Sequence, residues 1–189
     1  MALFVSEPPL VEPLTLADTK AHLKVETSDE DGLIGDLITV ARSHLEQECA
    51  LALITQTWRL TLDDWPPDGC ILIRRAPVVS IETVSVYDAG GEAMAVDLTG
   101  MMLDRHARPA RLLLDERVRP GRAINGIEVD FIAGFGADGQ AVPQVLKRAM
   151  LMHVAQMYEM RGAVATSDQP GAIPEGYMRL TAAYRRRAL

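Results

Sequence analysis

The sequence of 189 residues contains few cysteines, few aromatic residues and no surplus of positive charge. Its two cysteines, Cys49 and Cys70, cannot build the disulfide framework of a small secreted domain, and we interpret both as small buried apolar residues. Lysine and arginine together number 19 against 26 acidic residues, a formal net charge of −7. A general nucleic-acid binder needs the opposite excess to displace counterions from phosphates, so that class is excluded.

Long hydrophobic runs are also absent. The apolar start at residues 1–5 is too short for the core of a signal peptide and lacks a basic start. No window approaches the roughly 18 uninterrupted apolar residues of a membrane span. We therefore expect a cytoplasmic protein or part of a soluble assembly, without a membrane partner. The apolar fraction of 48% is too high for a disordered chain, and the length permits one domain or two small ones.

The charge is divided unevenly along the chain. Residues 1–64 contain 12 acidic and 4 basic side chains, residues 65–138 contain 11 and 8, and residues 139–189 contain 3 and 7. An acidic front and a basic tail predict head-to-tail complementarity between copies, or a tail that docks on an acidic partner. A merely solvated C-terminus is the simpler alternative.

The first block of the chain has helical periodicity. Thr15 and Asp18 have the spacing of a capping box, which predicts a short helix to about Leu23. Residues 28–31 repeat this signal, and apolar residues at helical spacing predict an amphipathic helix from there to about Cys49. The expected apolar stripe consists of Leu33, Leu37, Ala41 and Leu45, with Ile34 and Ile38 beside it.

The middle block changes to the alternating pattern of β-strands. Extended runs separated by turn signals are expected at residues 58–63, 70–74, 81–87, 93–98, 111–114 and 127–132. Several short strands with turns between them predict an antiparallel sheet or a small barrel.

The last block is helical again. Pro143 is placed to begin a helix to about Arg161 that is apolar on most of its faces, and such a helix is either central to a core or shared with a neighbouring subunit. Residues 162–173 are expected to form a loop, and Pro174 to begin a final helix that ends in three arginines. The residues expected to pack between subunits are Leu146, Met150, His153 and Met157.

Motifs for catalysis are weak. Gly134, Gly136 and Gly139 match GxGxxG after a strand, but residues 140–143 intervene before the helix whose N-terminus would have to hold a pyrophosphate. The histidines are scattered without the spacing of metal ligands, and neither GxSxG nor a Walker A motif is present. We expect no catalytic, cofactor-binding or metal-binding residues. A small nucleotide- or metal-binding enzyme that uses the loop Gly134–Gly139 stays an alternative.

The order of features carries a family resemblance. The segment LTLADTKAHLKV at residues 14–25 is followed by TQTW at 55–58, VPQVLKRAM at 142–150 and MYEMRG at 157–162. Together they extend over essentially the whole chain. This string resembles the head–tail connector (adaptor) proteins of long-tailed phages, prophages and gene transfer agents.

The resemblance implies an α+β fold in which N- and C-terminal helices form a bundle and a central antiparallel β insertion separates them. We expect N-terminal bundle helices in residues 1–54 and the β insertion in residues 55–138. A central helix and loop would follow in residues 139–173, and a basic docking helix in residues 174–189.

The resemblance also implies a non-enzymatic structural protein of the virion, located at the head–tail junction and assembled in the bacterial cytoplasm. A ring of about twelve copies would lie beneath the portal protein, extend the DNA channel without specific DNA binding, and provide the platform for head-completion (stopper) or tail proteins. The final helix would dock on the portal through apolar anchors and arginines. These docking residues are Tyr177, Leu180, Tyr184, Arg185, Arg186 and Arg187. A regulatory protein-interaction module that uses the helix at 143–161 is a further alternative.

Overall fold

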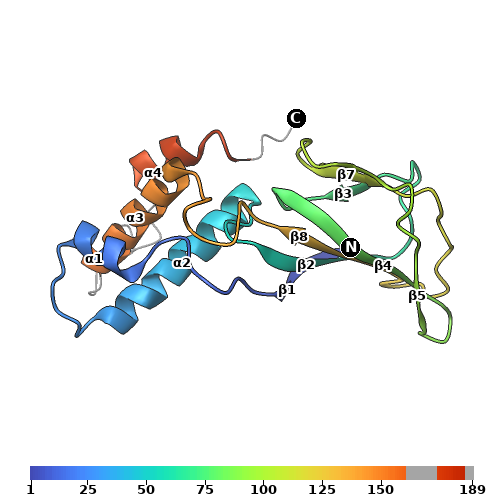
Figure 1. The fold of residues 1–189 in the computed structure, drawn as a ribbon, viewed down its shortest axis with the longest axis horizontal. Helices are drawn as coiled ribbons and strands as arrows, with labels where there is room; N and C mark the ends of the chain where they lie inside the picture. The colour runs from blue at the N-terminus through green and yellow to red at the C-terminus, as the bar shows by residue number, and fades with distance from the viewer. Residues whose placement is uncertain (161–173, 186–189) are drawn as a thin grey trace. The chain divides into compact units, whose positions relative to one another are not determined.

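The computed structural model describes residues 1–160 and 174–185, and its two compact units are shown in Figure 1. Met1–Leu10 and Thr55–Phe135 form one unit, which we call the β unit. Val11–Ile54 and Gly136–Leu189 form the other, which we call the helical unit. N- and C-terminal helices thus share one unit and an antiparallel β insertion makes the other, which confirms the predicted α+β class.

The secondary structure follows this division. The helices are α1 (Leu16–Leu23), α2 (Asp31–Cys49), α3 (Gln144–Glu159) and α4 (Glu175–Thr181). The strands are β1 (Ala2–Glu7), β2 (Gln56–Leu62), β3 (Ile71–Ile73), β4 (Val78–Tyr87), β5 (Ala93–Ala95), β6 (Met102–Asp104), β7 (Ala110–Leu113) and β8 (Ile127–Ala133).

Helix α1 begins with the predicted capping box. The Thr15 hydroxyl accepts a hydrogen bond from the backbone N–H of Asp18 at 3.0 Å and donates one to the Asp18 carboxylate at 2.7 Å. The helix ends at Leu23, where Lys24 adopts the left-handed conformation typical of a C-cap. Both bounds follow from local sequence, because capping contacts join residues only a few positions apart.

The predicted second cap is wrong, and contacts from other helices hold the start of α2 instead. The Lys20 ammonium of α1 donates to the Asp31 carboxylate at 2.5 Å, and the Tyr158 hydroxyl of α3 donates to the Glu30 carboxylate. Ser28 contributes only its backbone carbonyl, which accepts from the N–H of Asp31. The N-cap residue is Glu30, without a side-chain cap hydrogen bond.

The buried face of α2 is rotated from the predicted stripe. Ile34, Ile38, Ala41 and Leu45 are buried, whereas Leu33 is 37% exposed. The buried positions still follow helical spacing, and this face packs against α1 and α3. Amphipathicity therefore predicted the helix, and the neighbouring helices determined which of two adjacent apolar rows became core.

A partly buried ion-pair network lies beside this core. Arg42 of α2 donates to Glu12 at 2.7 Å and to Glu46 one helical turn later at 2.9 Å. The other carboxylate oxygen of Glu46 accepts from the backbone N–H of Leu53 at 2.7 Å. The network joins the segments before α1 and after α2 to the middle of α2.

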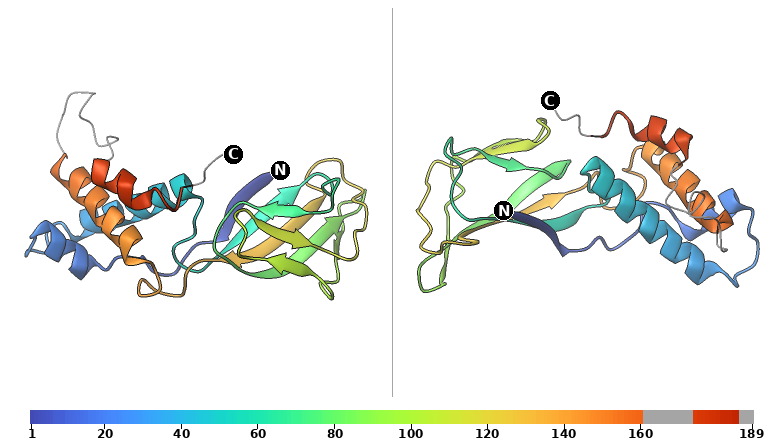
Figure 2. Two further views of the ribbon diagram at one scale, coloured as in Figure 1. Left: turned by 90° about the horizontal axis from the view of Figure 1, so that it is seen from above. Right: turned by 180° about the vertical axis from the view of Figure 1, so that it is seen from behind.

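The β unit contains two antiparallel sheets, ordered β1-β2-β8-β4-β5 and β3-β7-β6. The smaller sheet covers one face of the larger (Figure 2). In the register of β2 with β8, Trp58 lies opposite Phe131 and Leu60 opposite Val129, and all four are buried. The intervening residues face outwards, which gives the period of two that predicted these strands.

Strand β1 corrects the expectation that residues 1–54 belong to the helical bundle. Its residues pair with β2 from Ala2 opposite Thr61 to Glu7 opposite Thr57. A strand of this kind is stabilised by hydrogen bonds to a segment more than fifty positions away, which no local pattern reveals. The short strand β6 was also missed, and the β insertion ends at Phe135 rather than at residue 138.

Candidate functional site

A cluster of polar and aromatic side chains holds helix α4 against α2 and α3, and we call it the α4 anchor cluster. It consists of His44, Glu48, His153, Tyr177 and Arg185. The ring centres of His44 and His153 lie 5.0 Å apart, and those of His153 and Tyr177 lie 5.6 Å apart, both edge to face. One Arg185 guanidinium nitrogen contacts a Glu48 carboxylate oxygen at 2.6 Å.

Burial sets the protonation states in the α4 anchor cluster. Desolvation lowers the pKa of His153, and the neighbouring His44 lowers it further. Desolvation raises the pKa of the Tyr177 hydroxyl, and the nearby Glu48 carboxylate raises it further. At neutral pH, His153 and Tyr177 are therefore uncharged, and packing together with the pair between Glu48 and Arg185 attaches α4.

This geometry changes the interpretation of the predicted docking residues. Tyr177 is fully buried within its own chain, so its side chain is not a surface anchor in this structure. Leu180, Tyr184 and Arg185 are half-buried. Arg186 and Arg187 lie outside the described residues. The exposed side chains of α4 include Met178 and Arg179, which the sequence reasoning missed because it aligned the aromatic residues with the outer face.

The predicted subunit-packing residues lie mostly in the core of their own chain. Leu146, Met150 and His153 are buried in the helical unit, and Met157 is half-buried. Helix α3 packs against α1, α2 and α4, which surround most of its apolar faces. A helix that is apolar nearly all round is therefore explained here by three neighbours within the same unit.

The glycines of the GxGxxG match have structural roles. A Cβ atom on Gly139 would lie 2.3 Å from the backbone oxygen of Pro13, so only glycine permits this close approach in the helical unit. In the β unit, the Gly134 N–H donates to the Pro77 carbonyl at 3.0 Å. Helix α3 begins after Pro143, several residues beyond the last of these glycines. The loop thus lacks the helix N-terminus that a phosphate-binding turn requires.

Within residues 1–160 and 174–185, no three His, Cys, Asp or Glu side chains are grouped so that they could hold a metal ion. Across the same residues, none of the helices combines the length and the hydropathy that a membrane crossing requires.

The outward face of the larger sheet carries a second polar network. Arg59 of β2 donates to both oxygens of Asp130 of β8 at 2.7 Å, and also contacts Glu128 at 3.1 Å. The Tyr87 hydroxyl of β4 donates to Glu128 at 2.9 Å. The Asp130 carboxylate raises the pKa of Arg59, which stays charged. This network crosses three strands and gives the sheet a preorganised polar surface.

Helices packed around α3 in one unit and two antiparallel sheets in the other define an α+β class of protein, and comparisons with known proteins identify its family. The family model for phage gp6-like head-tail connector proteins matches residues 13–88. A chain in the neck of an empty GTA particle, computed with C6 symmetry, is 31% identical, with a TM-score of 0.82. The match covers 100% of this chain and 98% of that one.

Two further solved structures have the same coverage of 100% and 98%. A chain in the virion of the native gene transfer agent (GTA) particle is 30% identical, with a TM-score of 0.80. A chain in the neck of the native GTA particle, computed with C12 symmetry, is 30% identical, with a TM-score of 0.79. No curated protein is similar enough to add a relative. The chain belongs to the head–tail connector family.

Proposed function

We propose that this chain is a structural head–tail adaptor of a phage-like or gene transfer agent particle. About twelve copies form a ring beneath the portal, extend the DNA channel and provide the platform for a head-completion or tail protein. The observation that carries this proposal is the full-length similarity to a chain in a GTA neck computed with C12 symmetry. The match to the head-tail connector family supports a non-enzymatic role.

The charge of each unit supports a role as a conduit for DNA. The β unit, residues 1–10 and 55–135, contains 13 acidic and 9 basic side chains. The helical unit, residues 11–54 and 136–189, contains 13 acidic and 10 basic side chains. Since both units are net negative, neither displaces counterions from phosphates strongly, and DNA can pass the ring without being held.

The particle itself tests this proposal. In producing cells that lack the chain, we expect heads to accumulate without tails in electron micrographs. In normal particles, quantitative mass spectrometry should find the chain at about the copy number of the portal protein, because both form cyclic rings on one axis. Tailed particles of normal appearance in the absence of the chain would refute the proposal.

Docking through the final helix is part of the proposal, and we assign it to Leu180, Tyr184 and the arginines from 185 onwards. Deleting residues 174–189 is a poor test, because Tyr177 and Thr181 are buried and their loss would open the core of the helical unit. Two surface variants separate docking from internal attachment. Arg185→Ala removes the pair with Glu48, the hydrogen bond to Thr181 and any contact to the portal, whereas Glu48→Gln weakens the pair and the contact with His44 but leaves the Arg185 side chain in place.

Particle yield and stability are measured for both variants. If Arg185 docks on the portal, Arg185→Ala lowers the yield of tailed particles much more than Glu48→Gln does, and by more than the difference in stability between the two variants accounts for. Equal yields from the two variants would show that Arg185 only attaches α4 to its own chain.

A further inference from the structure

The larger sheet of the β unit has two edge strands, β1 and β5. In the part of the chain that the structure describes, β1 pairs only with β2 and β5 only with β4. Neither strand contains lysine or proline, and residues 2–6 and 93–95 are uncharged. Soluble proteins usually protect sheet edges with charges, proline, bulges, very short strands or a covering segment, because the unpaired N–H and C=O groups attract another strand. Here the protection is partial, since β1 has a register shift only between Val5 and Glu7, and β5 is short, with three residues.

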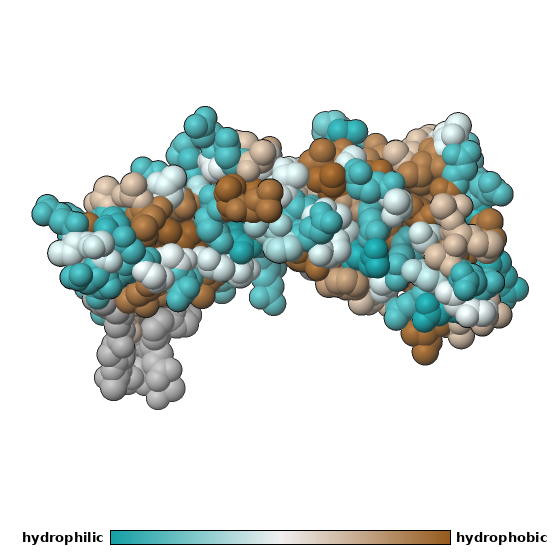
Figure 3. Space-filling view, turned by 60° about the horizontal axis from the view of Figure 1, so that its bottom comes forward, coloured by the Kyte–Doolittle hydropathy of each residue, from teal (hydrophilic) through white to brown (hydrophobic). Residues whose placement is uncertain are grey.

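The backbone of β1 is oriented for such pairing. The N–H of Ala2 faces β2, where it donates to the Thr61 hydroxyl at 3.3 Å. Because hydrogen-bonding direction alternates along an antiparallel strand, Leu3 and Val5 direct their N–H and C=O groups to the open edge. Apolar side chains also reach the surface of this unit (brown in Figure 3).

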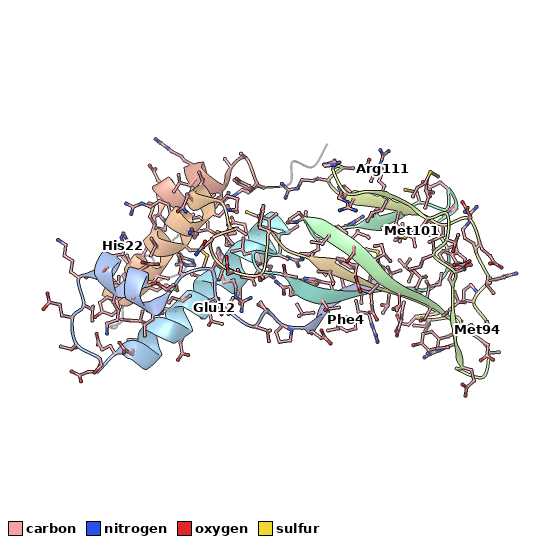
Figure 4. The ribbon with its side chains drawn as sticks, viewed as in Figure 1. Phe4, Glu12, His22, Met94, Met101 and Arg111 are labelled. Carbon is pink, nitrogen blue, oxygen red and sulfur yellow. The ribbon has the colours of Figure 1, made fainter. Side chains whose placement is uncertain are left out.

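The side chains at the two edges fit each other. Val5 lies opposite the buried Trp58, and Met94 lies opposite the buried Val86, so both project on the covered face of the sheet. They are nevertheless 38% and 45% exposed, because each sits at an edge without a neighbouring strand. Figure 4 labels Met94 on β5 and, on β1, Phe4, the residue beside Val5.

On the outward face of the sheet, the side chains of β1 and β5 are complementary in size. Phe4 lies opposite Arg59 on the outward face and is 47% exposed, although it is a large apolar side chain. The two outward residues of β5 are Ala93 and Ala95, opposite Tyr87 and Ser85. Small side chains on β5 leave room for the Phe4 ring of an added strand, while Val5 and Met94 meet on the other face.

We propose that β1 of one copy adds to β5 of the next copy, so that the larger sheets join around the ring. The occupant of each edge is thus a second copy of this chain, and the inference rests on the ring of the proposed function. Every neighbouring pair in the order β1-β2-β8-β4-β5 is antiparallel, so β1 and β5 have the same sense, although the twist of the sheet rotates their axes relative to each other.

Cyclic symmetry then fixes the kind of pairing. In a twelvefold ring, as in the C12 neck of the relative, adjacent copies differ by a rotation of only about 30°. The joined strands therefore have the same sense, and their pairing is parallel rather than antiparallel. Pairing of β1 with β1 requires a twofold axis, which closes a dimer and cannot propagate around a ring.

Cysteine crosslinking in purified particles tests this pairing. The variant chain carries Val5→Cys and Met94→Cys together with Cys70→Ser, because Cys70 is partly exposed whereas Cys49 is buried. After oxidation, we expect a ladder of covalent multimers of this chain on a non-reducing gel. Each single-cysteine variant should give none. The matched control combines Val5→Cys with Leu72→Cys, an exposed residue on an edge of the smaller sheet, and should also give no ladder.

The other outcomes overturn the pairing in distinguishable ways. Dimers from Val5→Cys alone would indicate β1 pairing with β1, and a crosslink from that variant to another virion protein would assign the edge to that protein. No ladder in particles with intact necks would refute the edge pairing and leave the proposed function standing. Absence of the chain from the particle would refute the proposed function itself.

A charge swap gives a second measurement that does not depend on disulfide geometry. Val5→Lys and Met94→Glu each place a charge on an exposed edge position, so each should fold normally and cause loss of tailed particles. The double variant should recover them, because the two charges would meet across the same contact. Full particle yield from both single variants would refute the pairing.

Discussion

The helical unit and the β unit have nearly the same net charge, but they use their charged side chains differently. In the helical unit, partly buried ion pairs hold elements together, as Arg42 does with Glu12 and Arg185 with Glu48, and Arg42 also pairs with Glu46 within α2. In the β unit, the interior is apolar and the network around Arg59 lies on the outward face of the sheet.

The difference shows which surfaces each unit leaves for partners. The acidic front and basic tail of the sequence predicted complementarity between copies. Part of that charge is instead neutralised within the helical unit, where Arg185 pairs with Glu48. The β unit satisfies its charges on one face and leaves its two sheet edges open. We therefore look to the β unit for contact between copies and to the end of the helical unit for contact with the portal.

The largest effects should come from cavities in the two cores, and they test whether the units unfold separately. Phe131→Ala in the β unit should cost about 3–5 kcal/mol, and Leu45→Ala in the helical unit about 2–5 kcal/mol, because both side chains are fully buried. Both tryptophans, Trp58 and Trp65, lie in the β unit, so urea unfolding followed by fluorescence reports that unit.

Circular dichroism at the helical minimum reports mainly the other unit, which contains all four helices of the described residues. Phe131→Ala should shift the fluorescence transition, and Leu45→Ala the dichroism transition. If each variant shifted both transitions equally, the two units would unfold as one and the comparison would fail.

The next largest losses of stability should come from removing charged side chains, and these losses should differ between the two units. Arg42→Met removes the guanidinium that neutralises buried Glu46 and also pairs with Glu12, and should cost about 3 kcal/mol, whereas Arg59→Met breaks a more exposed network and should cost about 1 kcal/mol or less. Chemical denaturation measures both. Adding Glu46→Gln to Arg42→Met should recover part of the loss, and no recovery would mean that Arg42 acts by packing alone.

A smaller effect separates the real helix cap from the apparent one. Thr15→Ala removes the acceptor for the Asp18 N–H and should lower the free energy of unfolding of the helical unit by about 1 kcal/mol. Ser28→Ala is the matched control, since Ser28 makes no cap for α2, and should change it by less than about 0.5 kcal/mol. Equal losses of stability in the two variants would show that Ser28 caps α2, as its spacing from Asp31 suggested.

The smallest expected effect is a loss of stability of the helical unit at acid pH. The pKa of His153 is lowered by burial and by His44, so the unfolded chain binds this proton more readily than the native chain. Stability is then complete above the unfolded pKa of about 6.5 and is lost as pH falls through it towards the lower native value. Glu48 opposes this shift, which keeps the effect small.

Thermal unfolding followed by dichroism between pH 8 and pH 5 measures this loss. His153→Gln should flatten the profile in part, because the pKa of His22 in the same unit is lowered too, by burial and by Arg148. His106→Gln in the β unit is the control and should leave the profile unchanged. An unchanged profile in His153→Gln would show that His153 is not the group that titrates.

Much of the fold could be predicted from local patterns. The capping box at Thr15, the alternation in β2 and β8 and the all-round apolar helix α3 were each visible, because caps and periodicity depend on residues within a few positions of one another. The strand β1 was not visible, since five mostly apolar residues before a proline pair become a strand only when β2 is beside them.

The candidate site was less predictable. The final helix was identified, but Tyr177 was assigned to its outer face, and the structure buries it between His44 and His153. A helix of seven residues is too short for amphipathicity to define one face, so the choice depends on which side contacts α3. For Leu146 and Met150 the sequence likewise left open whether they pack in the core of their own chain or against a neighbouring copy, and the structure buries both in their own chain.

The sequence by itself determined the family, the α+β class and the positions of most helices and strands, because motifs and periodicity are properties of neighbouring residues. Only the tertiary structure decided that residues 1–10 join the β unit, that Arg185 pairs with Glu48, and that β1 and β5 are the open edges of one sheet. Each of these depends on partners far apart in the chain. Their interaction energies arise only after the chain has brought them together, and so no local pattern carries them.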